Sequence, residues 1–211
     1  MSEETELTDL ELAALVSSRI CHDIISPVGA IANGIEVMDE ETDDTMREHA
    51  MDLIRKSATQ ASAKLQFARL AFGAAGSSGA TIDLNEAERV ARGVAESDKH
   101  TVEWSGPPAA MAKDKVKLLL NMITLALTAL PRGGSLKVSI SGEVETPSFE
   151  VRCDGESSRV PELLTKILDG TLNHAMDAHS IQPFYTKRIA TSAGMSLTAG
   201  KDGESVVISA A

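Results

Sequence analysis

The sequence predicts an α+β protein in which an N-terminal helical hairpin forms a dimeric four-helix bundle and an α/β sandwich follows it. Two observations support this expectation. Apolar and small residues recur in alternating steps of four and three over the first third of the chain, which is typical of helices packed along a seam. Beyond a glycine- and serine-rich stretch at 73–79, short β-like runs alternate with helical ones.

The first predicted helix begins at a capping box and continues to an acidic segment near Asp39. Thr8 and Glu11 have the spacing at which each side chain satisfies a backbone N–H group of the other residue. No strong stop signal interrupts the pattern before the acidic segment. The seam of this helix consists of Leu10, Ala14, Ser17, Cys21, Ile24, Val28, Ile31, Ile35 and Met38.

A second helix repeats the same pattern as far as Phe72. Its seam consists of Met51, Ile54, Ala58, Ala61, Leu65, Ala68 and Phe72. Because two helices alone cover each apolar stripe only in part, we expect a second copy of the chain to complete a four-helix bundle, which would make the protein a homodimer. The alternative is that the C-terminal part of the same chain covers the stripe.

The pattern divides the chain into a helical hairpin at 1–74, a linker at 75–80 and a second domain at 81–211. Strands are predicted in the second domain at 80–84, 101–104, 135–141, 148–153, 195–199 and 205–209. Helices are predicted between them at 86–95, 113–130, 160–168 and 178–192. This order favours helices packed over a mixed sheet.

Charge and composition exclude several classes of function. The formal net charge of −11 disfavours nucleic acid and anionic membranes as partners, and a protein partner fits better. The N-terminus lacks the pattern of a secretion signal, and the apolar stretch at 116–130 is too short and too often interrupted to span a bilayer. We therefore expect a cytoplasmic protein in which Cys21 and Cys153 are small buried hydrophobic residues. His174 and His179 fit no zinc-binding spacing and are interpreted as surface residues.

His22 is the candidate reactive residue, because it lies in mid-helix and points away from the seam. An exposed imidazole is largely unprotonated near neutral pH and can attack an activated phosphoryl group. Asp23 can accept a hydrogen bond from one ring nitrogen and so raise the nucleophilicity of the other. Pro27 removes the helical hydrogen bond to the Asp23 carbonyl at a cost of about 3 kcal/mol, which indicates a local requirement for a kink.

Mainly small or polar residues one turn from His22 leave room for a docking protein. We expect Ser18, Arg19, Ile25 and Ser26 to contact that protein. A single exposed histidine on a helix is usually an ordinary surface residue, so the interpretation depends on the whole string His22-Asp-Ile-Ile-Ser-Pro-Val28 on a helix with a seam.

That string resembles the H-box of dimeric sensor histidine kinases. The longer run Ser17-Ser-Arg-Ile-Cys-His-Asp-Ile-Ile-Ser-Pro-Val-Gly-Ala-Ile-Ala-Asn-Gly34 is similar to the ChpT-type histidine phosphotransferases of a bacterial cell-cycle phosphorelay. The resemblance implies that His22 accepts a phosphoryl group from the receiver domain of a hybrid kinase of the CckA type. It also implies that His22 passes the group to an Asp of response regulators of the CtrA and CpdR type.

The second domain resembles the ATP-binding domain of the same kinases, but it departs from their nucleotide-binding residues. The run Leu118–Gly134 follows their N-box and its Pro-x-Gly-Gly exit. Leu125, however, stands where a second magnesium ligand is expected after Asn121, and an aliphatic side chain cannot bind a hard cation. Asp154 is not followed by Gly-x-Gly, and the segment at 181–188 has no glycine that would admit phosphates. We expect no ATP binding and no cofactor of its own, with Mg²⁺ supplied by the receiver.

Two other hypotheses also fit the sequence. The chain could be a non-catalytic dimeric scaffold that binds receiver domains, in which case replacing His22 by Ala leaves it functional. It could instead be an ATP-dependent kinase with unusual nucleotide-binding motifs, in which case incubation with labelled ATP alone transfers the label to the chain.

Overall fold

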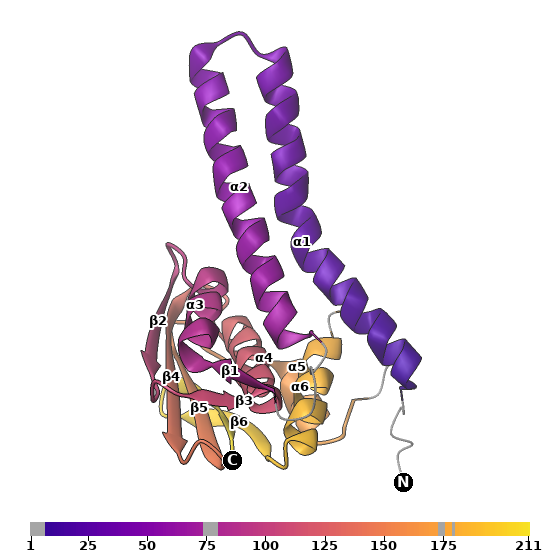
Figure 1. Ribbon diagram of the computed structural model, residues 1–211, viewed down its shortest axis with the longest axis vertical. Coiled ribbons are helices and arrows are strands. Elements are labelled where there is room, and N and C mark those ends of the chain that lie inside the picture. The colour runs from indigo at the N-terminus through magenta and orange to yellow at the C-terminus, as the bar shows by residue number, and fades with distance from the viewer. Residues whose placement is uncertain (1–6, 74–79, 173–175, 179) are drawn as a thin grey trace.

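A helical hairpin projects from one end of a mixed helix and sheet domain (Figure 1). The computed structural model describes residues 7–73, 80–172, 176–178 and 180–211. Within those ranges no helix is both long and apolar enough to cross a membrane. Of the predicted linker at 75–80 only Ala80 is described, and the predicted surface residues His174 and His179 lie outside the described residues.

Side-chain caps define where the hairpin helices α1 (Asp9–Glu40) and α2 (Asp44–Ala71) begin. The Thr8 hydroxyl accepts a hydrogen bond from the Glu11 backbone N–H at 3.3 Å, and the Glu11 carboxylate accepts one from the Thr8 N–H at 2.9 Å. The predicted capping box is therefore confirmed. At the start of α2, the Asp43 carboxylate accepts hydrogen bonds from two backbone N–H groups of the first turn.

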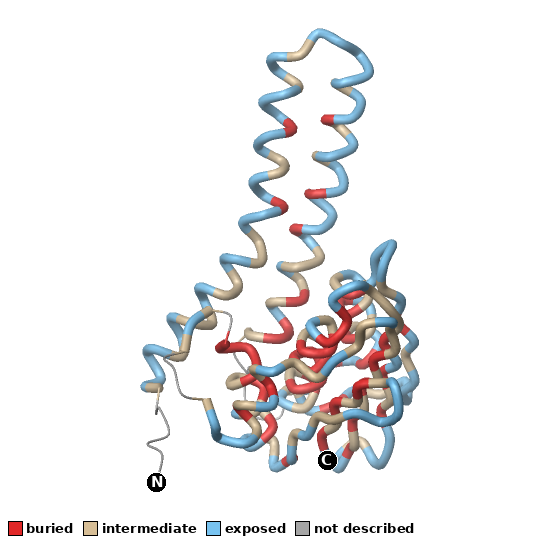
Figure 2. Tube along the Cα trace, turned by 180° about the vertical axis from the view of Figure 1, so that it is seen from behind, coloured by how far each residue is buried: buried red, intermediate tan, exposed pale blue. Residues whose placement is uncertain are grey.

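The two hairpin helices pack closely at Gly34, where α1 has no side chain. A Cβ atom on Gly34 would lie 2.7 Å from Cγ1 of Ile54, which is closer than real Cβ contacts. The buried hairpin residues alternate along the inner side of the hairpin, while its outer faces stay exposed (Figure 2). In the upper hairpin the buried positions are Pro27, Gly34, Ala50, Ser57 and Ala61.

The face of α1 that contacts α2 differs from the predicted seam by about one residue. Leu10, Val28 and Ile35 of that seam are 81%, 48% and 48% exposed. Cys21 is also exposed, so the prediction that it is a buried hydrophobic residue was wrong, whereas Cys153 is buried as predicted. The physical reason is that Pro27 and Gly34 set the contact between the helices, and no other part of the described chain covers the stripe.

The C-terminal domain is a layer of helices over a sheet (Figure 1). Its elements are β1 (Thr81–Asp83), α3 (Leu84–Ala95), β2 (His100–Ser105), β3 (Ala110–Ala112), α4 (Lys113–Ala129), β4 (Gly134–Gly142), β5 (Pro147–Asp154), α5 (Glu162–Leu168), α6 (Ile181–Ser192), β6 (Leu197–Asp202) and β7 (Ser205–Ala210). The described strands form a five-stranded sheet in the order β2-β4-β5-β7-β6 and a small pair of β1 with β3. In the larger sheet β2 is parallel to β4 and the other pairs are antiparallel.

Helix α4 lies at the centre of the core. Buried residues occur along nearly its whole length, and they pack against α3, α6 and the inner face of β5. Alternate residues of β5 and β7 are buried, which is the period expected for a sheet with one covered face. The short strand β3 was not predicted, and β6 begins two residues later than expected, after a turn at Gly194 with φ +70°.

The lower end of the hairpin is bonded to the C-terminal domain. Phe67, Leu70 and Ala71 at the end of α2 are part of the same core as α3 and α4. Polar bonds at the junction join Arg69 to Glu86 at 2.9 Å, Gln66 to Arg89 at 2.9 Å and the Lys117 ammonium to the Gly73 carbonyl at 3.0 Å. The C-terminal domain therefore covers the end of α2 but leaves the exposed stripe of α1 uncovered.

Candidate functional site

His22 lies on α1, next to the residue that Lys64 of α2 contacts. Its side chain is 61% exposed, in line with the predicted direction away from the helix pair. The ring can therefore be reached from outside by a second protein.

The Asp23 carboxylate lies beside the imidazole and is held from its other side by Arg19. The Arg19 Nε donates a hydrogen bond to Asp23 Oδ2 at 3.1 Å, and the Arg19 side chain is only 18% exposed. The second oxygen, Oδ1, lies 3.5 Å from Nδ1 of His22, which is longer than a good hydrogen bond. A carboxylate that accepts a hydrogen bond from Nδ1 favours the tautomer whose Nε2 carries the lone pair.

Pro27 lies inside α1 and is buried. Because proline has no N–H, the Asp23 carbonyl four residues earlier loses its partner in the helix. The Lys64 ammonium of α2 donates a hydrogen bond to that carbonyl at 2.8 Å. Asp23 is thus bound through its side chain by Arg19 and through its backbone by Lys64.

The four predicted docking residues occupy different environments. Ser18 and Ser26 are exposed, and Ile25 is a large apolar side chain that is 69% exposed. Arg19, in contrast, is bonded to Asp23. Its spacing of four residues before Asp23 on a helix was the signal that indicates this ion pair. Lys64 carries no comparable signal, because its contact depends on how α2 is aligned against α1.

The kinase-like asparagine of the second domain is fully buried. The Asn121 Nδ2 donates hydrogen bonds to the Ala71 carbonyl at 3.0 Å and to the Lys117 carbonyl at 2.7 Å. Its Oδ1 accepts a hydrogen bond from Nε2 of Gln182 at 2.7 Å. Leu125, one turn later, is buried as well. The amide of Asn121, in the middle of α4, therefore connects this helix to the end of α2 and to the first turn of α6.

The other kinase-like positions are also used for packing. Asp154 accepts a hydrogen bond from the Ser205 hydroxyl of the neighbouring strand β7. A Cβ atom on Gly155 would lie 2.5 Å from the Gly133 carbonyl oxygen, so no space is left for a side chain at this position. The segment that should be a phosphate loop forms the first turns of α6, where the rings of Tyr185 and Phe72 lie 5.6 Å apart. Burial raises the pKa of the Tyr185 phenol.

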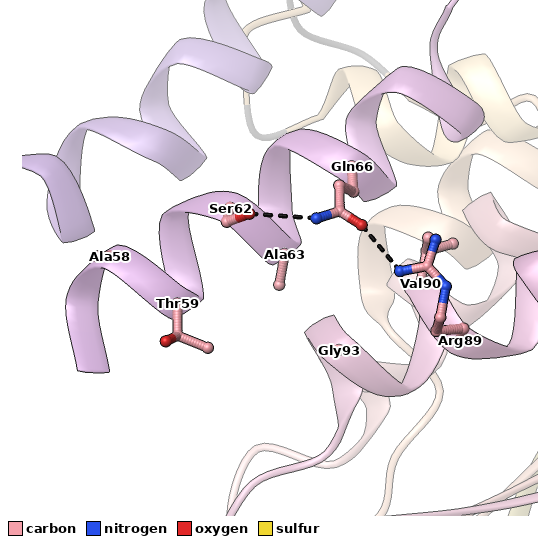
Figure 3. Close-up of a pocket in the computed structure, with 8 residues that line it drawn as sticks. All are labelled: Ala58, Thr59, Ser62, Ala63, Gln66, Arg89, Val90 and Gly93. Carbon is pink, nitrogen blue, oxygen red and sulfur yellow. Dashed lines mark hydrogen bonds between the residues drawn. The ribbon is translucent and has the colours of Figure 1, made fainter. Parts of the chain in front are cut away.

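Two surface hollows lie on the sides of α2. One of 460 Å³ lies between α2 and α3, where Gln66 bonds both Ser62 and Arg89 (Figure 3). The other, of 590 Å³, opens between α1 and the end of α2 and is lined mainly by apolar side chains, Tyr185 among them. Neither hollow includes His22 or Asp23. Within the described residues, no group of three or more His, Cys, Asp or Glu side chains could hold a metal ion.

Two of the comparisons with known proteins extend over the whole chain. The family model for the histidine phosphotransferase C-terminal domain matches residues 84–205. The protein phosphotransferase ChpT of Brucella abortus (strain 2308) is 46% identical over 211 residues, which is 100% of both chains. A bacterial phosphotransferase of known structure is 44% identical and superposes with a TM-score of 0.90 over 100% of both chains. The histidine kinase AdeS of Acinetobacter baumannii is 9% identical, with a TM-score of 0.46 over 90% of this chain and 95% of that one, a likeness too distant to bear on function.

Proposed function

We propose that this chain, which belongs to the histidine phosphotransferase family, carries the phosphoryl group on His22. Its function is histidine phosphotransfer in a two-component phosphorelay. The observation that supports His22 as the carrier is an imidazole that is 61% exposed beside a carboxylate held by an arginine. His49 and His100 lack such a partner among the bonds of the described residues, and His100 is bonded to the Leu130 carbonyl at 3.0 Å.

The nucleophile of the transfer reaction is the His22 imidazole. The lone pair on Nε2 of His22 attacks the phosphorus atom of an aspartyl phosphate on the donor receiver. A nitrogen–phosphorus bond forms while the phosphorus–oxygen bond breaks, and that electron pair stays on the donor carboxylate. The second transfer reverses these bonds with an Asp of the acceptor receiver, so that no oxidant or cofactor is consumed. The receiver supplies the Mg²⁺ that neutralises the charge of the transferring group.

Asp23 orients His22 and activates it. As Nε2 donates its electrons to phosphorus, positive charge develops on the ring, and the carboxylate beside Nδ1 stabilises that charge. Arg19 keeps the carboxylate in place through its 3.1 Å hydrogen bond. Ser18, Ile25 and Ser26 lie around the ring as the surface on which a receiver docks.

The partners that we propose are receiver domains: that of a hybrid kinase of the CckA type as donor, and regulators of the CtrA and CpdR type as acceptors, in cell-cycle control. We also propose that the chain is cytoplasmic. The net charge of −11 supports a protein partner over nucleic acid or an anionic membrane.

The second domain is proposed to bind no ATP. Asn121 is the one magnesium-ligand position of the kinase pattern that is retained, and its amide makes three hydrogen bonds inside the core. The Asn121 side chain is fully buried, so no lone pair of its oxygen is directed to a solvent-exposed site. It therefore cannot serve as a ligand of a metal–phosphate complex. The proposal is also supported by the segment at 181–188, which has no glycine and forms the first turns of α6 instead of a glycine-rich phosphate loop.

We further propose that the hairpin forms a homodimer. Among the described residues, every large hydrophobic side chain that is exposed lies on α1 or α2. They are Leu10, Ile25, Val28, Ile35, Val37, Met46, Leu53 and Leu65. Pairing two hairpins into a four-helix bundle would bury most of this surface without involving the C-terminal domain.

The experiment is transfer from a phosphorylated receiver to the wild type and to His22→Ala, with His49→Ala as the matched control. His49 is an exposed histidine on the same hairpin. The wild type and His49→Ala should gain a label that survives base but not acid, and His22→Ala should gain none. Equal labelling of His22→Ala would contradict the assignment. A scaffold would bind the receiver but acquire no label, and labelling by ATP alone would indicate a kinase.

A further inference from the structure

We propose that Lys64 of α2 is a positioning residue for His22. The inference rests on His22 being the phosphorylated residue, as proposed above. The Lys64 ammonium donates a hydrogen bond to the backbone carbonyl of the residue after His22, Asp23, at 2.8 Å. Its effect on transfer would therefore pass through the conformation of α1 at the reactive histidine.

The bond between Lys64 and Asp23 occurs at the one carbonyl of this turn that Pro27 leaves without a helical partner. A carbonyl in this position normally bonds to water or to a polar side chain, and the helix bends where such a group enters. Here the group is an ammonium from the neighbouring helix, and Lys64 is half-buried. A charged donor makes a stronger hydrogen bond than a neutral donor such as water does. The kink is thus fixed rather than left to fluctuate.

Asp23 is held a second time, through its side chain, by Arg19. The guanidinium bonds the Asp23 carboxylate at 3.1 Å, while the ammonium bonds the Asp23 carbonyl. Two cations on two helices therefore determine both the backbone and the side-chain orientation of Asp23. Because His22 is adjacent in the chain and its Nδ1 lies 3.5 Å from the Asp23 carboxylate, holding Asp23 also holds the imidazole. In group transfer a displacement of about 1 Å can lower the rate by about a hundredfold.

The test compares Lys64→Met, Lys64→Arg and a matched control, Lys56→Met, in single-turnover transfer from a phosphorylated receiver. Lys56 is an exposed lysine on the same helix. At saturating receiver, Lys64→Met should transfer at least about tenfold more slowly than the wild type, while the receiver concentration for half-maximal rate stays within about twofold. Lys64→Arg, which keeps a charged donor, should recover much of the rate. Lys56→Met should behave as the wild type.

A second measurement separates positioning from a general loss of structure. In Pro27→Ala the new N–H at position 27 can bond the Asp23 carbonyl, so Lys64 is no longer needed as its partner. Lys64→Met should lower the urea midpoint of the wild type and have little effect in the Pro27→Ala background. In NMR spectra, the His22 ring resonances should shift in Lys64→Met and not in Lys56→Met.

The proposal is overturned if Lys64→Met transfers within about twofold of the wild type, if Lys64→Arg fails to recover the rate, or if the urea effects of Lys64→Met are equal in both backgrounds. Failure of the proposed function gives a different result. In that case the wild type itself gains no label, or His22→Ala is labelled as well as the wild type.

Discussion

Replacing Asn121 by Leu should destabilise the fold without abolishing transfer, because this amide serves the core rather than a nucleotide. Leucine has nearly the same shape as asparagine but no polar atoms. The substitution removes three hydrogen bonds, of 3.0, 2.7 and 2.7 Å, from a fully buried residue. The Lys117 carbonyl keeps its helical partner within α4, but the Ala71 carbonyl and Nε2 of Gln182 lose theirs.

The magnitude follows from these two groups. A buried polar group left without a partner costs about 1–3 kcal/mol, so two of them cost about 2–6 kcal/mol. A domain is typically stable by only about 5–15 kcal/mol, and the loss should therefore be large in a urea titration. Gln182→Leu in the same background should add little, because Gln182 has already lost its partner. Gln60→Leu, at an exposed position of α2, is the control and should change the free energy of unfolding by less than about 0.5 kcal/mol.

The assay pairs urea unfolding with phosphotransfer at a temperature where the variant is still folded. We expect the folded variant to accept a phosphoryl group from a receiver at close to the wild-type rate. The reasoning is refuted if Asn121→Leu costs less than about 1 kcal/mol. It is also refuted if the variant keeps its stability but loses transfer, since that pattern belongs to a metal or nucleotide ligand.

Three further predictions concern single residues. Burial raises the pKa of the Cys153 thiol to about 12, whereas Cys21 is exposed. At pH 8 iodoacetamide should therefore modify Cys21 in the native chain and Cys153 only after unfolding. Rapid modification of both cysteines in the native chain would contradict this prediction. Gly155→Ala should cost about 1–3 kcal/mol in thermal or urea unfolding, because its Cβ would lie 2.5 Å from the Gly133 carbonyl oxygen; an unchanged midpoint would show that the loop yields freely. Thr8→Ala should lower the free energy of unfolding by about 1 kcal/mol, because it removes a helix cap. Hydrogen bonds from Thr8 lower the pKa of the Glu11 carboxyl, so the stability difference from the wild type should be full above the unfolded pKa of about 4.3 and shrink as the pH falls through the lower folded pKa. A pH-independent difference would exclude the Glu11 carboxylate as the cause.

Local signals in the sequence were sufficient for most of the fold. The Thr8 capping box and the stepwise repeat of apolar residues predict α1 and α2, and alternation predicts β4 and β5, because these patterns depend on neighbours along the chain. The exposure of Cys21 was not predictable in this way. A heptad repeat defines an apolar stripe on a helix but not which side of that stripe faces the other helix. In α1 the contact with α2 is set by Pro27 and Gly34.

The candidate site was predictable to the same extent. The residues His22 and Asp23 follow from a local motif, and the spacing of Arg19 indicates the ion pair that the structure contains. Lys64 comes from the other helix, 41 positions away, and its contact depends on the alignment of α1 against α2. The role of Asn121 likewise depends on Gln182, 61 positions away, so no local pattern could separate a metal ligand from a core amide.

The most direct test of the central claim is to locate the phosphoryl group on the chain. After transfer from a phosphorylated receiver, trypsin cleaves at Arg19 and Arg47 and releases a peptide, 20–47, in which His22 is the only histidine. Mass spectrometry at alkaline pH should find the phosphoryl group on this peptide and lose it after brief acid treatment. A phosphoryl group on the peptide at 48–55, which contains His49, or one that resists acid, would contradict the account.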